Sequence, residues 1–485
     1  MPYQPSARRP EDMAGTPKQM STIESEHSLR GSSGAGIVLA LVTISSFLVP
    51  FMSAATNVAL PRMGMELHID APMLPWVNTS YMLAAAALLL PLGRLADIYS
   101  RRRLFVGGTF AFSVVTAATA FAPSAPVLLG MRLLQGAVGA IPLAASMPLL
   151  VSTWPPEKRG RALGVNVAGV YSGLSLGPVI GGILTQTSGW QSIFLTTAGL
   201  ALVVGIAAAI RLPSPNVSPA REPLDIQGAL LSAAVLALLM VGLFRLPRVD
   251  GALFLLGSAG AAAAFVMREM RAASPLIDVR LFSGNRVFLF SNLAALVNYS
   301  ATAGVGFLLS LYLQHVRGLS PRQAGLVLVV QPVLMALLSI PAGRLSERIE
   351  PRWLASSGMA LTTAGMVVLA FLSDSSPMGL VLSVLALQGI AFALFSSPNT
   401  NAVMSSVDRS RLGVASATLG TMRSVGQMLS LGICGLLFAA VAGHLPVEQI
   451  PSHVFMRVLR IAFGLFATVC FCGIFASSAR GRMHS

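Results

Sequence analysis

Long apolar runs alternate with short polar connections along most of the chain. A helix needs about 20 apolar residues to cross the hydrocarbon core of a bilayer. The pattern therefore predicts an all-α membrane protein with fourteen transmembrane helices. The predicted spans cover residues 34–57, 74–96, 104–121, 126–150, 162–185, 190–210, 226–245, 252–267, 287–313, 322–344, 353–372, 378–403, 412–440 and 456–477. Twelve spans is the alternative if residues 226–267 lie along the membrane surface, but those runs are too apolar for that position.

The polar segments divide the chain into parts. The N-terminal segment is rich in Ser, Pro and Gly and has no apolar run, which predicts a disordered cytoplasmic tail. The first apolar run is too long and starts too late to be a cleaved signal peptide. Two charged connections set the seventh and eighth spans apart as an inserted pair. The predicted parts are a tail over 1–33, an N-terminal six-helix bundle over 34–210, a linker with the inserted pair over 211–286, a C-terminal six-helix bundle over 287–477 and a cytoplasmic tail over 478–485.

A charged hairpin after the second span recurs in the second half of the chain. Residues 93–104 have the sequence GRLADIYSRRRL, and residues 343–354, which lie 250 positions later, have GRLSERIEPRWL. Because Gly, acids and several arginines are unfavourable in hydrocarbon, each segment is predicted to be a water-side loop. Other segments match at similar offsets, which indicates that the two bundles are copies. Duplicated bundles of this kind build transporters whose substrate site lies between the halves at mid-depth.

Composition and charge agree with a membrane protein. The chain of 485 residues is 54% hydrophobic and 11% charged, with a mean hydropathy of +0.74, whereas a soluble protein has about 25% charged residues. The net charge of +15 could suggest nucleic acid. However, 24 of the 33 basic residues fall on one side of the predicted membrane. This is the positive-inside pattern, so both termini are expected in the cytoplasm of a bacterial cell and no nucleic-acid partner is expected.

The chain offers no chemistry for an enzyme. Cys434, Cys470 and Cys472 lie in apolar runs and are predicted to be packing residues, with no disulfide. No buried cluster of an acid with a base or a metal ligand is apparent, so no enzyme activity, cofactor or metal is predicted. The expected partners are a small-molecule substrate and the lipid bilayer, and we expect a monomer.

The two hairpins are candidates for a cytoplasmic gate. Gly93 permits a tight turn, and Asp97 can lie near the positive N-terminal end of a helix in the other bundle. The arginines can pair with acids across the gap; alternatively, they only fix the topology. The candidate gate residues are Gly93, Asp97, Arg101, Arg102, Gly343 and Glu347.

The fifth span carries glycines at intervals of four residues, followed by a proline. This spacing gives one smooth helix face that another helix can approach closely. The proline removes one backbone hydrogen bond and permits a bend. Ordinary close packing explains the pattern equally well. The residues of this motif are Gly173, Gly177, Pro178, Gly181 and Gly182.

Two arginines lie inside predicted spans. Placing an arginine at the centre of a membrane helix costs about 2.5–3.5 kcal/mol even on forgiving scales, so such a residue is a functional hypothesis by default. We expect Arg132 and Arg423 to face the central cavity. Hydrogen bonding to carbonyls or reaching toward the surface is the alternative, and it suits Arg132 better. Further polar candidates for the cavity or for coupling are Asn57, Gln135 and Gln388.

The hairpin at residues 93–104, the segment RLLQGAVG at 132–139 and the segment GLSLGPVIGG at 173–182 resemble three motifs of the major facilitator superfamily. The fourteen-span layout, with NVALP at 57–61, resembles its drug:proton antiporter branch. The resemblance implies two six-helix bundles plus an inserted helix pair and multidrug-type efflux. It also implies a cytoplasmic latch between the first hairpin and the start of the thirteenth span.

The sequence departs from that branch at one position. The branch typically has an acid in the first span, five residues before Asn57, and here that position is Met52. The acids nearest the membrane lie at predicted span ends or in loops. We therefore expect a cavity that is neutral or positive and substrates that are neutral or anionic amphipaths. Whether transport is coupled to protons stays open; coupling through rim acids such as Asp97 would be weak.

The leading hypothesis is a secondary transporter that exports small molecules by alternating access. A facilitator or importer of a metabolite is the alternative with the same fold. A receptor or scaffold is the alternative from another class, but no long polar segment is present to form an output domain.

Overall fold

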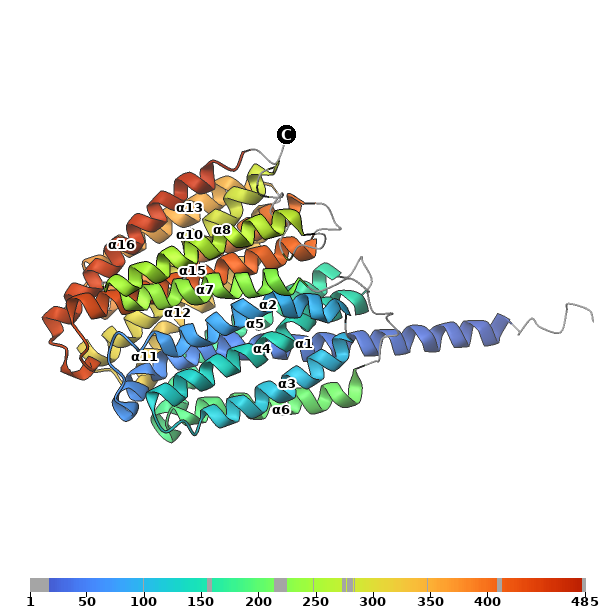
Figure 1. The fold of residues 1–485 in the computed structure, drawn as a ribbon. Helices are drawn as coiled ribbons and strands as arrows, with labels where there is room; N and C mark the ends of the chain where they lie inside the picture. Colours follow the sequence, from blue (N-terminus) through green and yellow to red (C-terminus); the bar gives the residue numbers. More distant parts are fainter. Residues whose placement is uncertain are drawn as a thin grey trace, which may run out of the picture.

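The computed structural model describes residues 17–98, 100–154, 159–212, 225–246, 248–272, 276, 282, 284–346, 348–407 and 412–481. Every regular element in these residues is helical (Figure 1). The N-terminal bundle comprises α1 (Pro17–Leu67), α2 (Trp76–Ile98), α3 (Arg101–Thr119), α4 (Ala125–Thr153), α5 (Arg159–Ser188) and α6 (Gln191–Arg211). The helix α1 begins inside the segment for which the sequence predicts a tail.

The inserted pair consists of α7 (Ile226–Arg245) and α8 (Val249–Arg271), which pack on each other. The C-terminal bundle follows in the order α10 (Arg286–Leu311), π-helix η3 (Tyr312–Val316), α11 (Pro321–Leu328), α12 (Val330–Leu345), α13 (Pro351–Ala370), α14 (Met378–Ser405), α15 (Leu412–Val441), 3-10 helix η5 (Val447–Gln449) and α16 (Ser452–Ser478). The break between α11 and α12 precedes Pro332, which has no N–H to donate back along the helix.

Within the described residues, twelve helices are long and apolar enough to cross a membrane, judged by length and composition. The sequence prediction of fourteen spans is therefore not confirmed. The two helices that do not meet these criteria are α2, in which only Trp76–Leu89 was counted among the described residues, and α3, which begins with three arginines. The molecule is thus a multi-pass membrane protein with an all-helical fold.

The helices pack in the same way in both bundles. The helix α1 lies along α5, α2 along α4, and α3 against α4 and α6. In the C-terminal bundle, α10 lies along α15, α12 along α14, and α13 against α14 and α16. These are the pairings expected of two copies of one unit. The inserted helix α7 contacts α2 of one bundle and α15 of the other.

The two bundles share an apolar core at one end of the molecule. This cluster joins buried side chains of α1, such as Leu60 and Met63, to side chains of the other bundle, such as Leu308 and Phe438. At the opposite end each bundle has a cluster of its own, one around Phe105 and Leu149 and one around Phe288 and Val403. The shared cluster therefore joins the bundles at the end that carries the loops after α1, α5, η3 and α15. A smaller cluster around Ala86, Met240 and Met428 also links α2 to α15 through α7.

Polar contacts cross between the bundles at the same end, which we call the closed end. The Ser310 hydroxyl donates to the Asn57 carbonyl at 2.8 Å, and the Gln314 amide donates to the Val58 carbonyl at 3.0 Å. The backbone N–H of Ala71 donates to the Leu445 carbonyl at 2.9 Å. His444 Nδ1 lies 2.8 Å from Asp70 Oδ2.

Candidate transport site

Arg132 of α4 is enclosed by the N-terminal bundle, and its side chain is 0% exposed. Its Nε donates to the Val77 carbonyl at 2.7 Å. Its Nη1 donates to Gln135 Oε1 at 2.7 Å, and its Nη2 donates to Asn78 Oδ1 at 3.1 Å. The guanidinium also lies 4.9 Å from the ring centroid of Tyr81. Neutral oxygens and an aromatic face therefore replace the water that this cation loses.

The network continues to α1 and α3. Gln135 Nε2 donates to Thr116 Oγ1 at 2.8 Å and lies 3.1 Å from Met52 Sδ. Asn78 Nδ2 donates to Asn57 Oδ1 at 2.7 Å. The described contacts of Arg132 include no carboxylate. The structure thus brings together three of the candidates predicted from the sequence, Asn57, Arg132 and Gln135.

The position of Arg132 differs from the expectation that its side chain lines a water-filled cavity. Val77, Asn78 and Tyr81 on α2 cover the guanidinium, so it faces the inside of its own bundle. The alternative of bonding to carbonyls describes this arginine better. Sequence reasoning missed Asn78 and Thr116, whose only signal was a polar side chain within an apolar run.

Arg423 of α15 is half-buried and keeps free hydrogen-bonding capacity. Its Nη2 donates to Thr400 Oγ1 of α14 at 2.6 Å, while its Nε is buried without a partner among the described residues. The guanidinium lies 5.7 Å from the ring centroid of Tyr299 on α10. The ring of Phe392 meets that of Tyr299 edge-on, with centroids 5.4 Å apart. A cation with an open donor beside two aromatic rings can bind an anionic or polar aromatic molecule.

Three further polar side chains of the C-terminal bundle are buried. Gln388 is buried, donates to the Thr362 carbonyl at 3.2 Å and therefore links α14 to α13. Asn298 and Asn399 are buried with amide atoms that have no partner within the described residues. They immediately precede Tyr299 and Thr400 in the sequence. Sequence reasoning missed Tyr299 and Thr400 as neighbours of Arg423. The only signal for them was a pair of adjacent polar residues within an apolar run.

The candidate gate is described only in part. Arg101 Nη1 donates to the Pro148 carbonyl at 3.4 Å, and Arg102 Nη2 donates to the Ala209 carbonyl at 2.7 Å, so both reach helices of their own bundle. Gly93 lies near the end of α2. Gly343 of α12 faces α14: a Cβ added there would lie 2.7 Å from Ser397 Oγ. The side chain of Asp97, the residue Glu347 and the first side chains of α15 lie outside what the structure describes, so the latch between the bundles stays a prediction.

The glycine-rich face of α5 lies against α1. A Cβ at Gly173 would lie 2.5 Å from the Phe47 carbonyl oxygen, and one at Gly177 would lie 2.7 Å from the Ala54 Cβ. Gly181 lies equally close, since its added Cβ would be 2.5 Å from the Ala55 Cα. A side chain at any of these positions would force the two helices apart.

The end of this motif meets the other bundle. A Cβ at Gly182 would lie 2.5 Å from the carbonyl oxygen of Pro321, the first residue of α11. Gly325 of α11 in turn lies against the Pro178 carbonyl. The α5–α11 contact therefore depends on a residue without a side chain in each helix.

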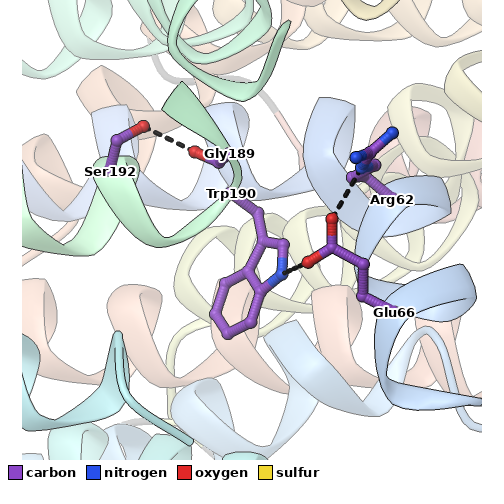
Figure 2. A network of polar contacts seen from close by, with 5 residues as sticks. All are labelled: Arg62, Glu66, Gly189, Trp190 and Ser192. Atoms are coloured by element: carbon purple, nitrogen blue, oxygen red, sulfur yellow. Dashed lines mark hydrogen bonds and ion pairs between the residues drawn. The ribbon is translucent and has the colours of Figure 1, made fainter. Parts of the chain in front are cut away.

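The closed end is braced within the N-terminal bundle by the contacts shown in Figure 2. Glu66 Oε1 accepts from Arg62 Nε at 2.6 Å, and Glu66 Oε2 accepts from the indole N–H of Trp190 at 2.8 Å. Trp190 is buried directly before α6, where Ser192 donates to the Gly189 carbonyl at 2.6 Å. The end of α1 and the start of α6 are thus tied together beside the surface that touches the other bundle.

Known proteins resemble the chain over nearly its whole length. The family model described as Major Facilitator Superfamily matches residues 42–291 and 291–481. The cephamycin export protein CmcT of Amycolatopsis lactamdurans is 33% identical over 480 residues, which cover 93% of this chain and 97% of that protein. The riboflavin transporter RibZ of Clostridioides difficile is 28% identical, covering 90% of this chain and 96% of that protein.

Solved structures show the same fold. A bacterial homologue of the human lysosomal transporter Spinster, in an inward-facing and unoccupied conformation, aligns with a TM-score of 0.68 at 17% identity, covering 92% of this chain and 97% of that one. The human organic anion transporter MFSD10 aligns with a TM-score of 0.62 at 15% identity, covering 91% of this chain and 99% of that one. The assignment follows from the repeated six-helix bundles, from the closed end that they share and from these matches. The chain is a transporter of small molecules, not an enzyme, and it belongs to the major facilitator superfamily.

Proposed function

We propose that this transporter exports neutral or anionic amphipathic molecules from the cytoplasm, with Arg423 and Tyr299 as substrate contacts. The observation that carries the proposal is the half-buried guanidinium of Arg423, which has an unpartnered Nε and lies 5.7 Å from the Tyr299 ring centroid. A carboxylate or polar oxygen of a substrate can accept from this arginine while an aromatic part stacks on the tyrosine. A lipophilic cation would meet a like charge there.

Export is supported by two kinds of observation. Similar proteins include the cephamycin export protein and a tetracenomycin C resistance and export protein of Streptomyces glaucescens. The glycine-rich face of α5 also resembles the motif of exporting antiporters. A facilitator or importer in the same fold is the second candidate, and it is favoured by the similarity to a riboflavin transporter.

The arrangement of the bundles supports alternating access. One core joins them at the closed end, and two separate cores lie at the other end. With the orientation favoured by the positive-inside pattern, this is a conformation open to the cytoplasm. We place the protein in the bacterial inner membrane as a monomer with both termini in the cytoplasm. In this arrangement α2 and α3 also cross the membrane, because they pack along α4 in the same way as α12 and α13 pack along α14.

We propose that the two bundles comprise residues 34–210 and 287–477, with α7 and α8 as an insertion between them. Coupling to protons is expected to be weak, because the described contacts of Arg132 and Arg423 include no carboxylate. Acids do occur near the rim: Asp225 forms an ion pair with Arg268 at 3.2 Å beside the buried Glu269, at the ends of α7 and α8.

The proposal is tested with everted inner-membrane vesicles and three fluorescent amphipaths of similar size, one anionic, one neutral and one cationic. We expect the vesicles to accumulate the anionic and neutral probes, and to do so only when they contain the protein. Vesicles that accumulate the cationic probe but not the others would contradict the proposed substrate class. Loss of preloaded probe without accumulation would favour the facilitator.

A further inference from the structure

The chain buries a cation just beyond the end of α16, away from the sites described above. Arg480 lies two residues after Ser478 and is 2% exposed. Its Nε, Nη1 and Nη2 are all buried and have no hydrogen-bond partner among the described residues. Burial lowers the pKa of Arg480 to about 9. A buried charge without a partner is unfavourable, and a bound anion would compensate the charge of these nitrogens.

Packing places Arg480 at the start of α13. The Ser356 hydroxyl of α13 donates to the Ser477 hydroxyl of α16 at 2.9 Å, and Cys470, two turns earlier in α16, donates to the Met359 carbonyl at 3.4 Å. The two helices therefore run antiparallel in fixed register. Continued by one turn, this register puts residue 480 level with the first turn of α13. The amide groups of a first helical turn carry a partial positive charge and attract anions.

A second arginine lies at the same level. The Nε of Arg352 is buried without a partner among the described residues, and its guanidinium lies 5.0 Å from the ring centroid of Trp353. Trp353 is 59% exposed. Exposed tryptophans of membrane proteins concentrate at the depth of the lipid headgroups.

The N-terminal bundle provides an internal comparison, because Arg102 corresponds to Arg352 in the repeat. There Arg102 Nη2 donates to the Ala209 carbonyl of α6 at 2.7 Å, and Arg211, the last residue of α6, is exposed to solvent. The guanidinium at this position of the N-terminal bundle thus reaches a carbonyl of the neighbouring helix. In the C-terminal bundle, by contrast, the buried guanidinium of Arg480 has no hydrogen-bond partner among the described residues.

We propose that Arg480, Arg352 and the first turn of α13 bind a phosphate group, and that an anionic phospholipid of the cytoplasmic leaflet supplies it. A guanidinium fork pairs with phosphate oxygens, and basic pockets between helices on the cytoplasmic side bind such headgroups. The exposed Trp353 favours the lipid over a free ion, because its ring lies where a headgroup would. The lipid source depends on the proposed orientation of the bundle, whereas the phosphate chemistry does not.

The test uses the full-length protein in a neutral detergent and follows thermal unfolding. Phosphatidylglycerol, phosphatidylcholine and inorganic phosphate are titrated separately into wild type, Arg480→Gln and the control Arg211→Gln, which removes an exposed arginine from the matching corner. We expect phosphatidylglycerol to raise the unfolding temperature of wild type and Arg211→Gln more than phosphatidylcholine does. The apparent affinity of Arg480→Gln for phosphatidylglycerol should be weaker by about tenfold or more.

Several results would overturn the proposal. Equal stabilisation of wild type by both lipids would do so without any variant, even if Arg480→Gln does not fold. An unchanged response to phosphatidylglycerol in Arg480→Gln would do the same. Stabilisation of wild type by inorganic phosphate as strong as that by phosphatidylglycerol would assign the site to the free ion and exclude the lipid. Arg480→Lys keeps the charge but loses the fork, so it should fall between wild type and Arg480→Gln.

Discussion

Nη1 of Arg132 lies 3.7 Å from Sδ of Met52, and the described partners of this fully buried cation are all neutral groups. An acid at position 52 would therefore stand beside this guanidinium and could take up a proton when the ion pair opens. We expect Met52→Asp to fold and to make transport depend on an imposed pH gradient. Uptake into proteoliposomes, with and without the gradient, measures this. The isosteric control Met52→Leu should leave transport insensitive to the gradient; if wild type already responds steeply, the account of a carboxylate-free network is wrong.

The helices were largely predictable from the sequence, because apolar runs of membrane length are a strong local signal. The predicted spans 126–150 and 190–210 correspond to α4 (Ala125–Thr153) and α6 (Gln191–Arg211). The exception is α1, which starts at Pro17 although the composition there predicts disorder. Helix starts are weakly encoded where the apolar pattern has not yet begun.

The candidate site was less predictable, because its contacts join helices far apart in the sequence. Arg132 stands out as a charge within a span, but only the packing of α2 decides that Asn78 and Tyr81 cover it. Arg423 also stands out as a charge within a span, and its side chain is half-buried. Its neighbours Thr400 and Tyr299 lie on two other helices, and no spacing rule links those positions to it.

Arg132 is expected to stabilise the N-terminal bundle. Arg132→Met would leave the Asn78 and Gln135 side-chain oxygens and the Val77 carbonyl without their donor. Each unsatisfied buried group costs about 1–3 kcal/mol, so we expect a loss of at least about 2 kcal/mol. Thermal unfolding in detergent measures the change. The control Met52→Leu, a volume-conserving substitution in the same network, should lower the free energy of unfolding by less than about 1.5 kcal/mol. Equal stability of Arg132→Met and Met52→Leu would argue against a structural role for the guanidinium.

Gly182 should control the closed end. In Gly182→Ala the new Cβ would lie 2.5 Å from the Pro321 carbonyl oxygen of the other bundle, so the closed end must loosen. A strain of about 1–3 kcal/mol would lower the ratio of closed to open molecules roughly 5- to 150-fold. Gly199→Ala on α6 is the matched control, because nothing lies within 4 Å of its added Cβ.

The readout is maleimide labelling of a cysteine placed at buried Ser310, with the exposed Cys472 replaced by serine. We expect labelling to be faster in Gly182→Ala than in wild type, while Gly199→Ala labels at the wild-type rate. Unchanged labelling in both variants would show that the α5–α11 contact does not hold the bundles together.

The substrate preference rests on the charge of Arg423, which lies 5.7 Å from the Tyr299 ring centroid and donates to Thr400 at 2.6 Å. The most direct test is concentration-dependent transport of one anionic and one neutral amphipath in proteoliposomes. It compares wild type, Arg423→Gln and the control Arg460→Gln, which removes an exposed arginine from α16. The account predicts that Arg423→Gln raises KM for the anion by about tenfold or more and leaves the neutral substrate nearly unchanged. Equal KM values for the anion in all three proteins would contradict it.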